Sequence, residues 1–337
     1  FRAWPEGVTG EYSADGVTWP VGDLMFEFSG IRFGFEICED AWVAGRPGNR
    51  MAELGVDVIL NPSASHFAFG KHHVRQRFVL EGSRSFGVSY VYANLIGNEA
   101  GRAIYDGGAM IASSGELIAA GPRFEFQQVD VVAADVDIHL TRSRRSSVHA
   151  LTADVSDAVH ERVIQTPGEI RVPDTPLTPP LLDQFCSETD EFTRAIALAL
   201  FDYLRKSRSQ GFVVSMSGGA DSSATACLVR CMVERGLQSL GPEQFAAVLG
   251  YLRDAPDDHS IDGWMRQLFT GVYQSTRNSS DVTLNAAKAV TQAIGGTWHQ
   301  LDVDPIVENY KSVVEEAIGR KLTWETDDIT LQNIQAR

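Results

Sequence analysis

The spacing of apolar and polar positions divides residues 1–140 into alternating strand-like and helix-like segments. Short apolar runs bounded by turn residues indicate strands, and apolar positions three or four apart indicate helices. The segment 26–38 contains two extended runs joined at the turn signal Ser29-Gly30. The other predicted elements are helices at 48–55 and 71–86, strands at 56–60 and 88–94, and two hairpin-like stretches with turn signals at Gly107-Gly108 and Ser114-Gly115. This mixture predicts a layered α/β fold.

A change in composition separates this part from a second α/β pattern. Residues 141–147 are polar and basic, and five prolines fall between Pro167 and Pro180, which is typical of an extended linker or of a strap across a surface. The elements predicted after them are a helix with apolar positions Phe192, Ala195, Ile196, Ala199 and Tyr203, strands at 212–216 and 298–303, and helices at 223–234, 281–294 and 305–318. The expected domains are 1–145 and 186–337, with a linker at 146–185.

Length and composition are those of a soluble protein with two domains. The 337 residues are 44% hydrophobic and 22% charged, which suffices for two buried cores. No apolar run is long enough to cross a membrane, no signal peptide is recognised, and the four cysteines form neither a CxxC pair nor a zinc-ligand spacing. These features predict a cytoplasmic protein without a membrane partner. The formal net charge of −15 disfavours a nucleic-acid partner.

A glycine- and serine-rich segment lies between the strand at 212–216 and the helix at 223–234. A loop in this position presents unpaired N–H groups at a helix N-terminus, where the helix dipole favours an anion. Gly218 and Gly219 allow close approach of the backbone, and the serine hydroxyls add donors. A carboxylate beside phosphate is repulsive unless a divalent cation lies between them. We therefore predict a phosphate-binding loop in which Asp221 is a ligand of Mg²⁺.

The segment 217–223, SGGADSS, resembles the SGGxDS loop of the pyrophosphatase-loop ATP enzymes, which cleave ATP between the α and β phosphates. The ATP-binding residues that this resemblance implies are Ser215, Met216, Ser217, Gly218, Gly219, Ala220, Asp221 and Ser222. Two further stretches, 272–280 and 328–337, resemble stretches of NAD synthetases. In that family the second stretch contacts deamido-NAD, which implies Asn333 and Arg337 as contacts. For Arg277, a contact with ATP phosphates and a solvated loop position remain open.

Cys38 follows an apolar strand and precedes Glu39-Asp40-Ala41-Trp42. A cysteine at such an elbow is accessible to substrate, and nearby positive groups would favour its thiolate. The ICEDAW context resembles the nucleophile elbow of nitrilase-superfamily amidases, specifically the glutaminase domain fused to NAD synthetases. The stretch 61–66 with Lys71 resembles the glutamine-binding stretch of that domain, which implies Ser65 and Lys71 as glutamine contacts. Residues 105–111 also match its pattern. His66, His72 and His73 lack a carboxylate partner in the sequence, and we assign no metal to them.

Nitrilase-type catalysis combines the cysteine with a glutamate base and a lysine that stabilises the oxyanion, and in the family both precede the cysteine. Here Lys71 is the first lysine of the sequence. The glutamates before Cys38 are Glu6, Glu11, Glu27 and Glu36, and none lies in the context expected for the base. We therefore expect the native chain to extend upstream of Phe1 and to supply both groups. We also expect it to continue beyond Arg337.

The resemblance covers nearly the whole chain and implies a glutamine-hydrolysing NAD synthase. Its expected fold is a nitrilase-like α/β sandwich followed by a doubly wound parallel-sheet domain like that of adenine nucleotide α-hydrolases. The expected small-molecule partners are glutamine, ATP with Mg²⁺, and deamido-NAD, without a prosthetic group, and the family implies a homo-oligomer. Three alternatives remain: another pyrophosphatase-loop amidotransferase such as a GMP-synthetase-like enzyme, a stand-alone nitrilase-like amidase, and an ammonia-dependent ligase with an inactive nitrilase-like scaffold.

Overall fold

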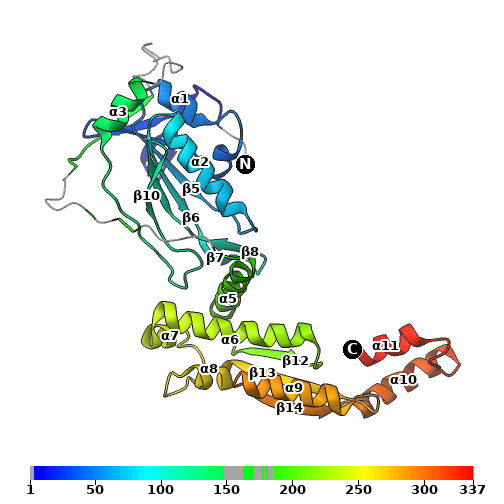
Figure 1. The fold of residues 1–337 in the computed structure, drawn as a ribbon. Helices are drawn as coiled ribbons and strands as arrows, with labels where there is room; N and C mark the ends of the chain where they lie inside the picture. The colour runs from blue at the N-terminus through cyan, green and yellow to red at the C-terminus, as the bar shows by residue number, and fades with distance from the viewer. Residues whose placement is uncertain are drawn as a thin grey trace. The chain divides into compact units, whose positions relative to one another are not determined.

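A computed structural model describes residues 4–99, 101–147, 162–170, 177, 179–180 and 186–336 (Figure 1). The chain forms two compact units, Phe1–Ala199 and Leu200–Arg337. Both combine helices with strands that are at least partly parallel, which confirms the predicted α/β class. None of the helices in the described ranges combines the length and the apolar character that a bilayer crossing requires.

The described part of the first unit contains a seven-stranded sheet in the order β10-β9-β6-β5-β4-β3-β11. Its strands are β3 (Met25–Phe28), β4 (Ile31–Phe35), β5 (Val58–Ser63), β6 (Ser89–Asn94), β9 (Met110–Ser113), β10 (Glu116–Ala120) and β11 (Val163–Thr166). The central strands β4, β5 and β6 are parallel, and β3, β9 and β10 join antiparallel. Parallel strands buried on both faces favour continuous apolar runs, and Val58-Ile59-Leu60 form such a run in the first half of β5.

Helices cover this sheet, and two small hairpins accompany it. The other elements are the hairpin of β1 (Thr9–Ala14) and β2 (Val17–Gly22), the hairpin of β7 (Ile96–Glu99) and β8 (Ala103–Asp106), the 3₁₀ helix η1 (Cys38–Trp42), and the helices α1 (Pro47–Glu53), α2 (Lys71–Ser85) and α3 (Ile138–Ser146). Figure 1 shows α2 running along the sheet. Its Val79 packs in the same core as Tyr90 and Tyr92 of β6. The core thereby holds α2 beside the ends of β5 and β6.

Two predictions for this unit are wrong. Gly107-Gly108 is not a hairpin turn, because the hairpin of β7 and β8 turns near Gly101 and the glycine pair follows β8 with positive φ at both residues. The polar segment 141–147 is not linker, because it forms most of α3. Arg142 and Arg145 of this helix contact the buried carboxylate of Asp57. A buried carboxylate requires charged partners, and the helix supplies them.

The predicted linker at 146–185 also contributes to the sheet where it is described. Residues 163–166 form β11, which pairs in parallel with β3. Further along, the carbonyl of Pro180 accepts a hydrogen bond of 2.7 Å from the N–H of Ala120. The described part of this segment therefore lies along the first unit as a strap, which is one of the two roles its composition predicted.

Helix α5 (Glu188–Ser207) contains the division between the two units, at Ala199–Leu200. The helix is where the pattern predicted it, but Phe192 and Tyr203 are 45% and 53% exposed. Its buried apolar residues are Ala195, Ala197, Leu198, Phe201 and Leu204. Apolar residues occur around most of this helix, so spacing alone does not select the buried face.

The second unit contains a three-stranded parallel sheet in the order β12-β13-β14. Its elements are β12 (Phe212–Ser215), α6 (Ala220–Leu240), α7 (Pro242–Val248), α8 (Ile261–Leu268), β13 (Phe269–Ser275), α9 (Asp281–Ala293), β14 (Thr297–Asp302), α10 (Asp304–Ile318) and α11 (Asp328–Ala336). Helix α6 begins at Ala220, three residues before its predicted start. The glycine- and serine-rich loop therefore joins the end of β12 directly to the N-terminus of α6.

Candidate active sites

Cys38 lies at a sharp elbow between β4 and η1. Its φ of +50° is in the left-handed region, which a residue with a Cβ rarely adopts. The side chain of Asp40 holds the elbow, because its Oδ2 accepts a hydrogen bond of 2.8 Å from the N–H of Ile37. Cys38 itself is half-buried and carries a free thiol. Backbone strain of this kind persists only where surrounding contacts maintain it, and it is concentrated at functional sites.

Glu36 anchors the same elbow from inside the core. Its carboxylate is fully buried and accepts hydrogen bonds from Arg46 at 2.6 Å, from the Tyr90 hydroxyl at 2.6 Å and from the N–H of Gly48 at 2.8 Å. The Arg46 guanidinium also lies over the ring of Phe86, 4.9 Å from its centroid. Burial, together with the charge of Glu36, raises the pKa of Tyr90, which keeps this hydroxyl a donor. These contacts make Glu36 part of the support beneath Cys38.

Lys71 lies within electrostatic range of Cys38. It opens α2 and is half-buried, and its ammonium lies 5.4 Å from the centroid of the Trp42 ring. Burial and then the positive charge of Arg75 lower the pKa of Lys71, whereas Asp106 and Cys38 act in the opposite direction. The first turn of α2 contains no acidic residue. A lysine at a helix N-terminus is suited to an anionic group of a ligand.

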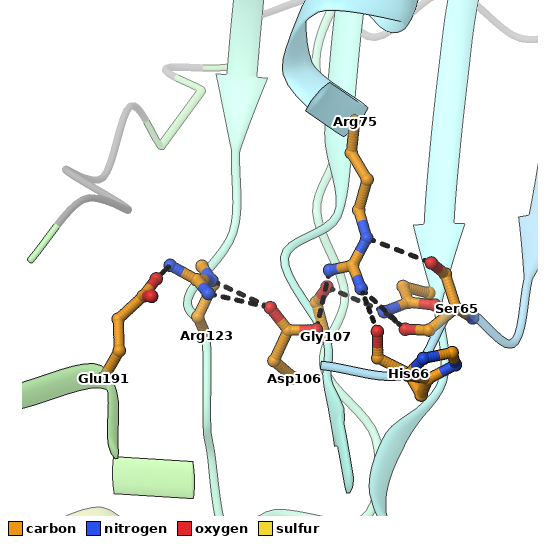
Figure 2. A network of polar contacts seen from close by, with 8 residues as sticks. Ser65, His66, Arg75, Asp106, Gly107, Arg123 and Glu191 are labelled. Atoms are coloured by element: carbon orange, nitrogen blue, oxygen red, sulfur yellow. Dashed lines mark hydrogen bonds and ion pairs between the residues drawn. The ribbon is translucent and has the colours of Figure 1, made fainter. Parts of the chain in front are cut away.

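Ser65, the other predicted glutamine contact, is held on both its backbone and its side chain. Its N–H donates to Asn94 Oδ1 at 2.9 Å, and its carbonyl accepts from Arg75 Nη2 at 2.7 Å. Its hydroxyl oxygen accepts a hydrogen bond of 3.2 Å from Arg75 Nε (Figure 2). Because a guanidinium only donates, the Ser65 hydroxyl keeps its own proton available for a further acceptor. The charge of Arg75 also lowers the pKa of Lys71, so one arginine acts on both predicted glutamine contacts.

Sequence reasoning overlooked the groups that hold these two residues in place. Arg75 lies one helical turn after Lys71, and this i, i+4 spacing was the available signal. Asp106 was part of a matched motif without a role of its own, and it contacts Arg75 at 2.6 Å.

Trp42 ends the ICEDAW motif, and its ring packs edge-to-face on Phe78. Tyr92 packs against Phe78 in turn. Burial raises the pKa of Tyr92 to about 12.

In the second unit, the segment 215–222 forms a tight turn at the carboxyl end of β12. The N–H of Met216 donates to the carbonyl of Val272 at 2.8 Å, which extends the pairing of β12 with β13. Gly218 has a φ of +79°, and a Cβ at this position would lie 2.4 Å from the carbonyl oxygen of Thr283. Gly219 is the N-cap residue of α6. Position 218 is therefore a place where only glycine fits between the strand and α9.

Hydroxyls complete this loop around the N-terminus of α6. Ser217 Oγ accepts a hydrogen bond of 3.2 Å from the N–H of Gly219 and lies 3.1 Å from Ser222 Oγ. Ala220 and Asp221 open the helix, and both are exposed. The Ser215 hydroxyl donates to Gln274 Oε1 at 2.5 Å. These groups surround the free N–H groups of a helix start, an arrangement suited to phosphate.

The donor set at Asp221 fits a magnesium ion that also binds nucleotide phosphate. Mg²⁺ commonly uses one or two carboxylates and takes its remaining ligands from water and phosphate oxygens. Asp221 is an exposed carboxylate in the first turn of α6, next to Ser222 in the sequence. In the described ranges, no three His, Cys, Asp or Glu side chains come together as a metal-binding group. Asp221 is the carboxylate that this loop contributes.

The two remaining motif stretches lie against each other. Gln335 Nε2 of α11 donates to Thr276 Oγ1 at 3.1 Å, which connects α11 with the loop after β13. Asn333 is exposed on α11, whereas Leu331 and Ile334 pack toward Leu322. Arg337 lies outside the described residues. Arg277 pairs with Asp304 at 2.6 Å and remains 60% exposed, so the structure leaves both interpretations of this arginine open.

Comparisons with known proteins identify relatives of both units. Residues 192–337 match the family model for NAD synthase. Over 334 residues the chain is 31% identical to a glutamine-dependent NAD(+) synthetase of Oryza sativa subsp. indica, which covers 95% of this chain and 45% of that protein. It is also 31% identical over 337 residues to the synthetase of that name from Saccharomyces cerevisiae, which covers 94% of this chain and 47% of that protein.

Solved structures agree with these matches. A glutamine-dependent NAD(+) synthetase from Cytophaga hutchinsonii superimposes with a TM-score of 0.77 at 39% identity, covering all of this chain and 50% of that one. The Acinetobacter baumannii synthetase, solved with adenosine diphosphate, shares the fold with a TM-score of 0.61 at 19% identity, covering 93% of this chain and 45% of that one. The chain spans about half the length of the relatives it matches.

Proposed function

We propose that this chain belongs to the family of glutamine-dependent NAD(+) synthetases and that it is the part of such an enzyme that contains the glutamine-hydrolysing cysteine and the ATP-phosphate loop. The proposed overall reaction transfers the amide nitrogen of glutamine to deamido-NAD, with ATP as the energy source. The observation that carries the proposal is the strained elbow at Cys38, with the ammonium of Lys71 against the ring of Trp42 in the same motif.

In the first unit, we propose that the Cys38 thiolate attacks the side-chain amide carbon of glutamine. The C–N bond breaks, and the NH2 group takes up the proton that the thiol released and leaves as ammonia. The γ-glutamyl thioester that remains is hydrolysed by water to glutamate and the free thiol. Lys71 binds the α-carboxylate of glutamine, because its charge and the N-terminus of α2 both favour an anion. The Ser65 hydroxyl donates to the same substrate, since Arg75 already occupies its acceptor side.

In the second unit, the segment 215–222 holds the phosphates of ATP while the nicotinate carboxylate of deamido-NAD attacks the α-phosphorus. Pyrophosphate leaves, and ammonia then displaces AMP from the adenylate to give NAD. Mg²⁺ bound at Asp221 would neutralise charge on the phosphate oxygens. Asn333 and Arg337 are the proposed deamido-NAD contacts. The match of residues 192–337 to NAD synthase supports this substrate over that of another pyrophosphatase-loop amidotransferase.

The test separates the two nitrogen sources in the full-length protein. Cys38→Ala removes the nucleophile, so we expect glutamine-supported NAD formation to fall by ~10³-fold or more. Ammonia-supported formation should remain within about threefold of wild type, because the adenylate accepts ammonia from solution. Cys186→Ala, which removes another half-buried thiol of the first unit, is the matched control.

Two outcomes contradict the proposal. A Cys38→Ala protein that still uses glutamine shows that Cys38 is a structural residue. A folded Cys38→Ala protein that has lost both activities shows that one site serves both reactions. Circular dichroism of each variant establishes that the comparison is between folded proteins.

A further inference from the structure

A continuous chain of buried ion pairs runs from Glu191 to Arg75, and Arg75 donates a hydrogen bond to the hydroxyl of Ser65 (Figure 2). Arg75 Nη1 contacts Asp106 Oδ1 at 2.6 Å, Arg123 Nη2 contacts Asp106 Oδ2 at 2.9 Å, and Arg123 Nη1 contacts Glu191 Oε1 at 2.6 Å. The side chains of Arg75, Asp106 and Arg123 are at most 3% exposed, and that of Glu191 is 10% exposed. Two cations and two anions therefore alternate from α2 to the first turn of α5.

The alternation makes each member depend on its neighbours. Each oxygen of Asp106 accepts from a different arginine, so Asp106 fixes the planes of Arg75 and Arg123 together. Arg75 then uses its remaining donors on the Ser65 hydroxyl, the Ser65 carbonyl and the His66 carbonyl. Interactions among buried charges are strong because little water screens them. A change at Glu191 is thus transmitted to the loop at Ser65 through three ion pairs.

Apolar contacts hold the same two segments against each other. Ala195 and Leu198 of α5 form a buried cluster with Phe124, and Phe67 packs against this cluster. Phe67 lies two residues after Ser65, and its N–H donates to the carbonyl of Ile104 at 2.6 Å. The segment 188–199 therefore supports the Ser65 loop by charge and by packing. It is as much a part of the first unit's site as α2 is.

We propose that Glu191 is a positioning residue for glutamine, which acts through Arg123, Asp106 and Arg75 to hold Ser65 as a donor to the substrate. This inference rests on the proposed function, because it takes Ser65 as a glutamine contact. Glu191 does not touch glutamine in this arrangement. The glutamine site consequently extends into the first turn of α5, well beyond the predicted domain end at residue 145.

The experiment measures glutamine hydrolysis and NAD formation in the full-length protein. Glu191→Gln keeps the shape of the side chain and removes its charge. We expect the KM for glutamine to rise about tenfold, the gain of a charged over a neutral hydrogen bond, with kcat nearly unchanged. Ammonia-supported NAD formation should not change. Glu191→Asp, which restores the charge, should recover part of the loss.

Glu188→Gln is the matched control. Glu188 lies in the same first turn of α5, is exposed, and undergoes the same change in charge. Its KM for glutamine should equal that of wild type. An unchanged KM in Glu191→Gln, an equal rise in Glu188→Gln, or a loss of ammonia-supported synthesis in Glu191→Gln each overturns the inference.

A second pair of variants separates this inference from the proposed function. Ser65→Ala should raise the KM for glutamine, and adding Glu191→Gln to it should raise the KM little further, because both act through one hydroxyl. If Ser65→Ala leaves the KM unchanged, the proposed role of Ser65 in glutamine binding is wrong. If Ser65→Ala raises the KM and Glu191→Gln does not, only the positioning role of Glu191 is wrong.

Discussion

The Cys38 site and the loop at 215–222 are organised by different kinds of group. Around Cys38 the supporting groups are buried charged side chains, with Glu36 and Arg75 both fully enclosed. Around the loop they are backbone N–H groups and serine hydroxyls, and Asp221 is exposed. A nucleophile needs a fixed direction and a controlled charge, which buried ion pairs provide. A phosphate site needs donors that water can occupy until the nucleotide binds.

This difference predicts how the two sites respond to substitution. Changes among buried charges alter the stability of the first unit as well as its site, because an unpaired buried charge is costly. Changes at exposed positions of the loop alter ligand binding and leave folding nearly untouched. Activity and stability measured on the same variants therefore test the comparison directly.

Among the groups that support the two sites, the largest effect is expected for Asp221→Asn. It removes the carboxylate proposed for Mg²⁺, so NAD formation should fall by about 100-fold or more with glutamine and with ammonia alike. The melting temperature should stay close to that of wild type, because Asp221 is exposed. Asp281→Asn, an exposed acid in the first turn of α9, is the control and should keep full activity. Wild-type turnover of Asp221→Asn at ordinary Mg²⁺ concentrations contradicts the assignment.

The glycines of the loop provide a closer comparison. Gly218→Ala introduces a Cβ 2.4 Å from the carbonyl of Thr283 at a positive φ, which costs at least ~1–2 kcal/mol of stability from the conformation alone. Gly219→Ala meets only the Ser217 hydroxyl, at 3.3 Å and without a positive φ. The first substitution should weaken ATP binding and lower the melting temperature, and the second should do much less. Equal effects of the two would show that the path of this loop does not depend on Gly218.

In the first unit, Arg142→Ala tests how much stability is lost when the buried carboxylate of Asp57 loses one of its two arginine partners. Burial acts to raise the pKa of Asp57, but the hydrogen bonds from Arg142 and from the Arg32 N–H, together with the charges of Arg142 and Arg145, outweigh burial and lower the pKa. We expect a loss of about 2 kcal/mol in the free energy of unfolding at neutral pH, since Arg145 still pairs with Asp57. Arg84→Ala, which removes an exposed pair with Glu81, should cost less than ~0.5 kcal/mol.

The sign of the pH dependence follows from the lowered pKa of Asp57. A carboxyl with a lower pKa in the folded than in the unfolded state stabilises the protein above its unfolded pKa, and this contribution is lost as the pH falls below about 4. Wild type should therefore lose more stability on acidification than Arg142→Ala does. Denaturant titrations of both proteins at several pH values measure the difference, and parallel losses would contradict the assignment to Asp57.

How far the sequence predicts each region follows from how local its contacts are. The segment 71–86 and the loop at 215–222 were located correctly, because helical spacing and a strand–loop–helix order are local properties. The α3 helix was mistaken for linker because its stabilising contact is with Asp57, which is far away in the sequence. The chain from Arg75 to Glu191 could not be predicted for the same reason, since its four members come from α2, β8, the segment after β10 and α5.

The smallest expected effect concerns the charge of Lys71. Its pKa lies below the usual 10.5, first because of burial and then because of Arg75, so it becomes neutral at a lower pH than an exposed lysine. If the positive charge of Lys71 binds the glutamine carboxylate, the KM for glutamine should begin to rise at a lower pH than it would with an exposed lysine. Lys71→Arg retains the charge, so the rise in KM should move toward more alkaline pH in this variant. Titration of the substrate's own amine is common to both proteins and cancels. Identical pH profiles of KM would show that the Lys71 ammonium does not bind the substrate, and the loop at Ser65 would then hold glutamine without it.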